Sequence, residues 1–98
     1  MDPKVKKIVS QIKKKYKPEK IILFGSHARG DTHEGSDVDL LLIKETDKKF
    51  TKRTEEVLTQ IDYDIDLDVL VYTEKEIEKM LSEKNPFMEK AWKEGVAV

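Results

Sequence analysis

The chain has 98 residues, of which 38% are hydrophobic and 40% are charged, and its formal net charge is −1. A chain of this length buries about two thirds of its unfolded surface, so we expect a single domain over residues 1–98. It contains no cysteine, no long apolar run and no charged-then-apolar leader. Disulfides, membrane spans and secretion are therefore not predicted, and a cytoplasmic location is expected.

The charges are unevenly distributed along the chain. Residues 1–20 hold eight lysines against two acidic residues, whereas residues 55–78 hold nine acidic residues against one lysine. A lysine-rich end can contact nucleic acid or an acidic partner. However, lysines on the outer face of an amphipathic helix are more often only solvated, and Tyr16 is the only aromatic residue in this segment. Nucleic-acid binding is therefore open but not favoured.

A helix is predicted at the start of the chain. Asp2 can cap it and Pro3 can occupy its first turn. Its apolar residues recur at i, i+3, i+4 and i+7, which gives one buried face made of Val5, Ile8, Val9 and Ile12. Pro18 ends this helix.

Three strands are predicted after this helix. Residues 20–24 and 37–43 are short aliphatic runs, and the second is apolar enough to be a central strand. Residues 63–72 alternate with period two, so one face carries Ile65, Leu67, Val69 and Val71 and the other carries Asp64, Asp66, Asp68 and Leu70.

Further helices are predicted between and after these strands. A helix near residues 51–61 would bury Val57, Leu58 and Ile61. Thr73 and Glu76 form a capping box for the next helix. The last helix begins at Asn85-Pro86, and Gly95 can end it. With a short helix after the first strand, the order α, β, α, β, α, β, α, α predicts an α/β (α+β) fold.

The segment FGSHARGDTHEGSDVDLLL, residues 24–42, separates two strands with polar residues. Gly25 allows a ligand to approach the backbone, and free N–H groups at the start of a following helix suit a phosphate. Ser26 adds a hydroxyl donor and Arg29 adds a forked cation. The segment lacks the glycines of the dinucleotide-binding motif and the lysine of a P-loop. A phosphate site is therefore one interpretation of a common turn.

Asp37 and Asp39 indicate a functional site more strongly than the Gly-Ser turn does. Residues i and i+2 of a strand project from the same face, with Cα atoms roughly 6.7 Å apart. Two carboxylates held there repel unless a cation lies between them, and oxygen ligands favour Mg²⁺ or Mn²⁺. Asp68 is placed to add the third carboxylate of a two-metal site for phosphoryl or nucleotidyl transfer. The alternative is that Asp37 caps a turn and Asp39 lies on a solvated sheet face.

Two other metal sites are not supported. Counting from Asp62, the sixth position of a calcium loop is Leu67 rather than glycine, and the twelfth is Thr73 rather than glutamate. An EF-hand is therefore rejected. His27 and His33 have no cysteine near them, so we interpret both as exposed loop residues rather than zinc ligands.

The combined motif resembles a known signature. Gly25-Ser26, ten further residues and Asp37-Val38-Asp39 resemble the DNA polymerase β-like nucleotidyltransferase superfamily, in particular its minimal nucleotidyltransferase (MNT) group. Most of the chain takes part in the resemblance, including the N-terminal helix, the third strand with Asp68 before VLVYT, and the final NPF…EG helix. It implies a small mixed β-sheet with helices packed on it.

The resemblance also implies roles for the nucleotide-binding residues. In this superfamily the Gly-Ser turn holds the nucleotide phosphates, which assigns that role to Gly25 and Ser26. Arg29 and Ser36, which lie between the two parts of the motif, are expected as further nucleotide contacts.

The carboxylates receive metal and catalytic roles from the same resemblance. Asp37 and Asp39 are expected to bind two Mg²⁺ ions, with Mn²⁺ as an alternative. Asp68 is expected to complete the metal site and to help deprotonate the acceptor hydroxyl. Asp66 projects from the same predicted face, so the choice of Asp68 rests on its family-like context.

The implied reaction transfers a nucleoside monophosphate, with AMP from ATP favoured over other nucleotides, to a hydroxyl acceptor. The resemblance implies a HEPN-domain helical partner in a toxin–antitoxin pair, in which the MNT chain neutralises and adenylylates the toxin. Two alternatives stay open: a catalytically silent antitoxin that acts by binding, and a nucleotidyltransferase that modifies nucleic acid. A homodimer also stays open.

Overall fold

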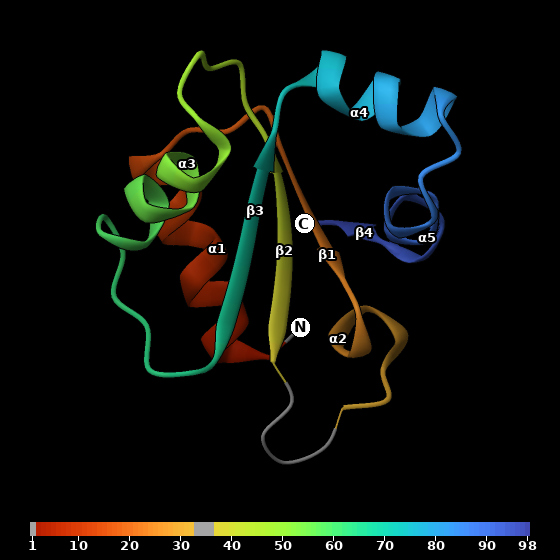
Figure 1. Cartoon of the computed structure of the whole chain (residues 1–98). Helices are drawn as coiled ribbons and strands as arrows, with labels where there is room; N and C mark the ends of the chain where they lie inside the picture. Colours follow the sequence, from red (N-terminus) through yellow and green to blue (C-terminus); the bar gives the residue numbers. More distant parts are fainter. Residues whose placement is uncertain (1, 33–36) are drawn as a thin grey trace.

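A computed structural model describes residues 2–32 and 37–98 of the chain. Its helices and strands mostly alternate along the sequence (Figure 1). In chain order they are α1 (Pro3–Lys15), β1 (Lys20–Phe24), α2 (Ser26–Arg29), β2 (Val38–Ile43), α3 (Phe50–Leu58), β3 (Leu67–Tyr72), α4 (Glu74–Ser82), α5 (Pro86–Glu94) and β4 (Val96–Ala97).

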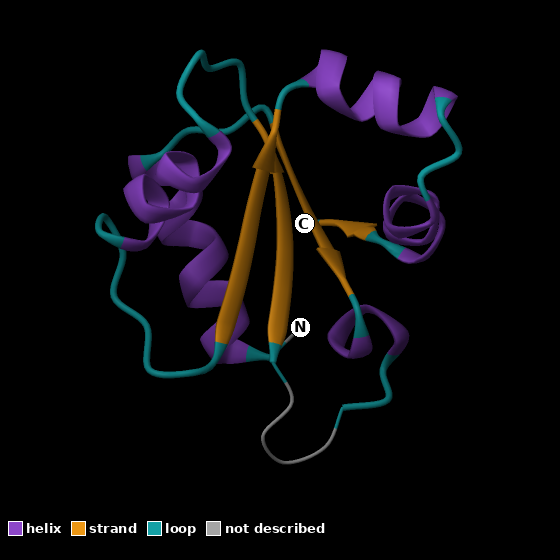
Figure 2. Cartoon of the chain, in the orientation of Figure 1, coloured by secondary structure: helices purple, strands orange, loops and turns teal. Residues whose placement is uncertain are grey.

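The four strands form one mixed sheet in the order β3-β2-β1-β4 (Figure 2). β1 runs antiparallel to both β2 and β4, and β2 runs parallel to β3. The α/β class and the mixed sheet expected from the sequence are confirmed. α3 makes the crossover between the two parallel strands, because parallel neighbours cannot be joined by a tight turn.

Helices cover both faces of the sheet. α1 and α3 lie against one face, where the buried strand residues are Ile21, Leu23, Val38, Leu40, Leu42, Val69 and Val71. α4 and α5 lie against the other, over Ile22, Leu41 and Ile43 (Figure 1). Beyond Asp39, β2 is therefore buried from both sides, which explains why residues 40–43 are continuously aliphatic instead of alternating.

The first helix matches its prediction. The Asp2 side chain accepts a hydrogen bond of 2.7 Å from the Lys4 N–H, and Pro3 opens the helix. The predicted apolar face is buried, and the lysines project outward. No helix in residues 2–32 and 37–98 is both long and apolar enough to cross a lipid bilayer.

Several predicted features differ from the structure, and the smallest difference is that β2 begins at Val38 instead of residue 37. β3 begins at Leu67 instead of residue 63, because β2 begins only at Val38 and offers no partner for the earlier residues. α3 ends at Leu58, and Ile61 is buried beyond its end. β4 was not predicted, because its two exposed residues join the sheet through backbone pairing and carry no apolar periodicity.

The outer edge of β3 is covered by α3. Thr54 Oγ1 donates to the Val69 carbonyl at 2.9 Å, and Arg53 Nη1 donates to the Val71 carbonyl at 3.2 Å. These carbonyls point away from β2 and would otherwise stay open to pairing with another chain. The side chains of α3 therefore close the edge of the sheet.

Arg53 also joins α3 to α4. Its guanidinium is buried and donates to both Glu76 oxygens, at 2.6 and 3.2 Å, while its Nε donates to the Lys48 carbonyl at 2.8 Å. Glu76 additionally completes the predicted capping box with Thr73. The hydrogen bonds from Arg53 are the main reason that the pKa of Glu76 lies below its usual value.

Acid should remove the contribution of Glu76 to stability. Because its pKa is lower in the folded state, this contribution is present above the unfolded pKa of about 4.5 and is lost as pH falls through the folded value. Urea unfolding should show that Glu76→Gln is less stable than the parent chain at pH 7, and that the difference disappears at low pH. Glu55→Gln, which removes an exposed carboxylate, is the matched control. A difference that is constant with pH would contradict the assignment.

Candidate active site

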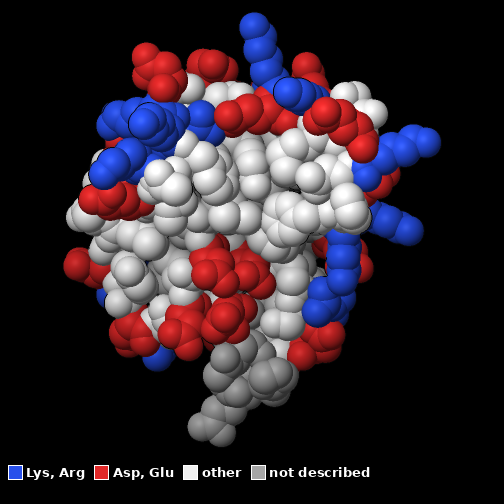
Figure 3. Space-filling view, viewed as in Figure 1, with Lys and Arg blue, Asp and Glu red and all other residues white. Residues whose placement is uncertain are grey.

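The parallel pairing of β2 with β3 brings two acidic residues together. Asp39 lies opposite Asp68 in the register, and on its other side it lies opposite Phe24 of β1. Asp39 is half-buried and Asp68 is exposed. Acidic side chains gather near the ends of β2 and β3 that are lower in Figure 3, below a broad uncharged surface. The acidic cluster expected from the sequence is therefore formed across two strands.

The environment of Asp39 disfavours its charged form. Partial burial is the largest cause that raises the pKa of this carboxyl above its usual value. The charge of Asp68, a hydrogen bond shared with Asp68 and the charge of Asp37 raise the pKa further, while His27 lowers it. A carboxylate in this position gains from any cation that approaches it.

Asp37 and Asp66 both lie immediately before the strands. Asp37 is exposed at the start of β2, close enough for its charge to act on Asp39. Asp66 is exposed before β3, and its carbonyl accepts a hydrogen bond of 2.9 Å from the Val38 N–H. Because Asp68 is paired with Asp39 and Asp66 precedes that pair, the register favours Asp68 as the third carboxylate.

Gly25 allows the first strand to turn beside Asp39. Its φ angle is +76°, which is unfavourable for residues that carry a Cβ atom. A Cβ atom built at this position would overlap the Oδ2 atom of Asp39. Glycine is therefore required at position 25 for two independent reasons, which are the positive φ angle of the turn and the close approach of the Asp39 carboxylate.

His27 is a site residue that the sequence analysis interpreted wrongly. It was expected to be an exposed loop residue, but it lies in α2 and is half-buried. Its Nε2 atom is fully buried, with no hydrogen-bond partner among the described residues, and its charge lowers the pKa of Asp39. The only feature of the sequence that could have indicated this burial is the position of His27 directly after the Gly-Ser turn. His33 lies outside the described residues.

The other residues expected to contact the nucleotide are Ser26, Arg29 and Ser36. Ser26 is the first residue of the single-turn helix α2, directly after Gly25. Arg29, at the end of that turn, donates from Nε to Asp31 at 3.2 Å and from Nη1 to Glu94 at 3.3 Å. These pairs tie α2 to α5 and hold the guanidinium. Ser36 lies outside the described residues.

Two hollows adjoin this cluster. One, of about 410 Å³, contains Asp39 and Asp68 beside apolar side chains that include Leu70 and Phe87. The other, of about 200 Å³, is lined by Gly25, Arg29 and Lys90 among others. Phe24 and Phe87 line both hollows and contact each other edge to face, with ring centroids 5.7 Å apart. Lys90 was missed because its helix is distant in sequence from the motif.

The donor atoms of the acidic residues suit a divalent cation. Asp37, Asp39 and Asp68 supply only oxygen donors, which suit Mg²⁺ or Mn²⁺, and their mutual repulsion is what such an ion would relieve. Among residues 2–32 and 37–98, no three acidic or histidine side chains are gathered tightly enough, as they stand, to hold an ion by themselves.

Two known proteins are similar to this chain in sequence. Two relatives, both from Methanocaldococcus jannaschii, carry the name "Putative protein adenylyltransferase". One is 49% identical over 45 residues, which cover 44% of this chain and 45% of that protein. The other is 37% identical over 85 residues, which cover 87% of this chain and 80% of that protein. The first alignment thus spans less than half of that relative.

A solved structure shares the fold. The crystal structure described as a "putative nucleotidyltransferase" from Sulfolobus solfataricus aligns with a TM-score of 0.60 and 28% sequence identity, over 76% of this chain and 68% of that one. The nucleotidyltransferase domain family matches residues 4–95, almost the whole sequence. The chain therefore belongs to the nucleotidyltransferase domain family.

Proposed function

We propose that this chain transfers AMP from ATP to a hydroxyl group of a protein. The observation that carries the proposal is the pairing of Asp39 with Asp68 beside the turn at Gly25. This arrangement sets carboxylates next to a backbone turn that a phosphate can approach. Membership of the nucleotidyltransferase family and the names of the two archaeal relatives support the same reaction.

In this reaction the acceptor oxygen attacks the α-phosphorus of ATP and the bond from that phosphorus to the pyrophosphate oxygen breaks. The acceptor hydroxyl gives its proton to Asp68, which is the more exposed carboxylate of the pair. Gly25 and Ser26 bind the phosphates, and Lys90 adds positive charge beside them. Mg²⁺ held by Asp37, Asp39 and Asp68 would supply the positive charge that such a transfer needs.

The acceptor in this proposal is a HEPN-domain partner, which the chain neutralises as the antitoxin of a toxin–antitoxin pair. Its support is the resemblance to the minimal nucleotidyltransferase group together with relatives named as protein adenylyltransferases. Binding without catalysis would neutralise the partner equally well, so activity needs a direct test.

Asp39→Asn tests the central carboxylate. The amide keeps the shape of the side chain but loses the charge that holds a cation, so the transfer rate should fall roughly a thousandfold. Thermal stability should not fall, because one of several repelling charges is removed. Asp47→Asn, in an exposed loop, is the control. Near-normal turnover of Asp39→Asn, measured with radiolabelled ATP, would contradict the proposal.

Gly25→Ala tests the contact between the turn and Asp39. Gly30→Ala is a close control, because Gly30 has a similar φ of +80° but no atom within 4 Å of an added Cβ. Gly25→Ala should be the less stable variant, because Gly25 (ψ −154°) has a backbone conformation almost restricted to glycine whereas Gly30 (ψ 13°) is left-handed helical, so activities are compared at a temperature at which both variants are folded. Only Gly25→Ala should also lose activity by about tenfold or more, because it displaces the Asp39 carboxylate. Equal activities in the two folded variants would exclude a specific role for the contact.

Transfer of label from α-phosphate-labelled ATP, GTP, CTP and UTP identifies the base and the acceptor. The chain is incubated with Mg²⁺ and purified HEPN partner, beside Asp39→Asn. We expect AMP on the partner, absent with the variant. Label on RNA in preference to the partner would indicate a nucleic-acid enzyme. Tight partner binding without label would indicate an antitoxin that acts by binding.

A further inference from the structure

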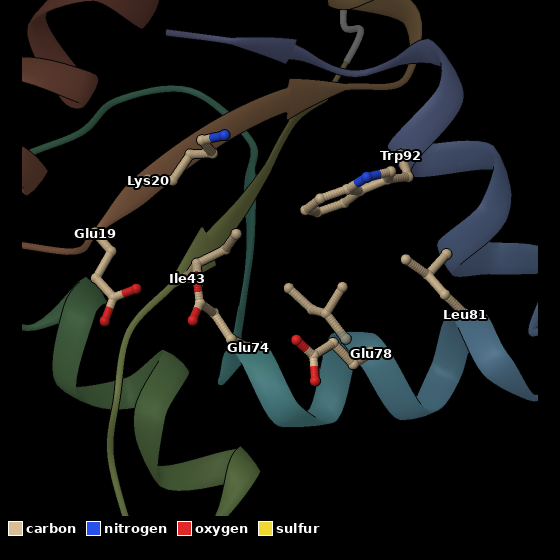
Figure 4. Close-up of a pocket in the computed structure, with 8 residues that line it drawn as sticks. Glu19, Lys20, Ile43, Glu74, Glu78, Leu81 and Trp92 are labelled. Atoms are coloured by element: carbon tan, nitrogen blue, oxygen red, sulfur yellow. The ribbon is translucent and has the colours of Figure 1, made fainter.

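A second surface lies at the other end of the sheet from the carboxylates. It is a groove of about 400 Å³ between α4, α5 and the neighbouring ends of β1 and β2. Its apolar lining is formed by Ile43, Ile77, Leu81 and Trp92. Figure 4 shows the Trp92 indole projecting from α5 over the space beside α4. This indole is 42% exposed, whereas Ile43 and Ile77 are buried below it.

The rim of this groove is acidic. Glu74 and Glu78, one turn apart on α4, line it together with Glu19, which lies just before β1 (Figure 4). Of the described residues that line the groove, only Lys20 is basic. Within the described part of the chain, none of the three glutamates forms an ion pair with a lysine or arginine. The groove thus combines an apolar floor with unneutralised negative charge.

We propose that this groove, which we call the Trp92 groove, binds an amphipathic segment of a partner protein that carries apolar side chains flanked by lysine or arginine. The apolar side chains would cover Trp92 and Leu81, and the basic ones would pair with Glu74 and Glu78. The choice of occupant follows from charge complementarity, which disfavours the binding of acidic segments and orients basic ones. An exposed tryptophan in an apolar groove is also a typical anchor of a protein interface.

The Trp92 groove lies on the sheet face from which Asp39 projects. Ile43 and Asp39 are four residues apart on β2, so their Cα atoms are separated by roughly 13 Å along the strand. A partner bound in the groove is therefore held on the side of the sheet that carries the carboxylates. That such a partner brings its acceptor hydroxyl to the carboxylates rests on the proposed function, whereas its binding in the groove does not.

The chain contains one tryptophan, so its fluorescence reports this groove directly. The probe is a 14-residue synthetic amphipathic helix of leucine and lysine, without tryptophan. Binding should shift the Trp92 emission to shorter wavelength as the indole leaves water. A leucine–glutamate peptide of the same pattern and a serine–lysine peptide should cause no shift at the same concentrations. Because the readout is binding, it is independent of nucleotidyl transfer.

Variants locate the binding. Glu74→Gln with Glu78→Gln should weaken binding of the leucine–lysine peptide by about fivefold, since two rim ion pairs are lost. Glu83→Gln with Glu89→Gln removes the same charge at the end of α4 and on α5, outside the groove lining, and should leave the affinity unchanged. Circular dichroism confirms that both double variants are folded.

Several results would overturn the proposal. The absence of a shift with the leucine–lysine peptide would show that the groove does not bind such a segment. An equal shift with the leucine–glutamate peptide would show that charge does not select the occupant. An equal shift with the serine–lysine peptide would show that apolar contacts do not contribute to binding. An emission shift that follows protein concentration without peptide would show that a second copy of the chain occupies the groove.

Discussion

The register between the parallel strands β2 and β3 is the constraint on which the site depends. It places Asp39 opposite Asp68, so that two carboxylates from distant parts of the sequence share one position. Side chains alternate between the faces of a strand, so a slip of one residue would send Asp68 to the opposite face. The register is fixed by the residues that follow, because Val69 and Val71 must enter the core under α1 and α3. The free energy gained by burying these side chains thus offsets the electrostatic repulsion between Asp39 and Asp68.

The edge strand that carries Asp68 needs support from outside the sheet, because β3 has only one strand neighbour among the residues that the structure describes. α3 provides this support through Thr54 and Arg53, which bind the outward carbonyls of β3. Arg53 extends the support to α4 through Glu76. A buried guanidinium that joins three elements fixes their relative positions, since none can move without leaving polar groups unpaired.

The face of the sheet covered by α4 and α5 carries two different surfaces. At one end, acidic residues lie beside the hollows that contain Phe24 and Phe87. At the other end lies the Trp92 groove, with its apolar floor and acidic rim. Residues of α4 and α5 line the Trp92 groove, and Phe87 of α5 lines both hollows. A protein that docks at one end and reacts at the other would use both surfaces.

The sequence by itself determined the local features of this protein. The limits of β1, the Asp2 and Thr73 caps and the start of α5 at Pro86 follow from residues that are neighbours in the chain. The tertiary structure alone decided the pairing of Asp68 with Asp39, the burial of His27 Nε2 and the position of Lys90 beside the Gly25 turn. It also decided β4, whose two residues join the sheet only because α5 ends next to β1. These features depend on contacts between segments that are distant in sequence, and no local pattern of charge or hydropathy encodes such contacts.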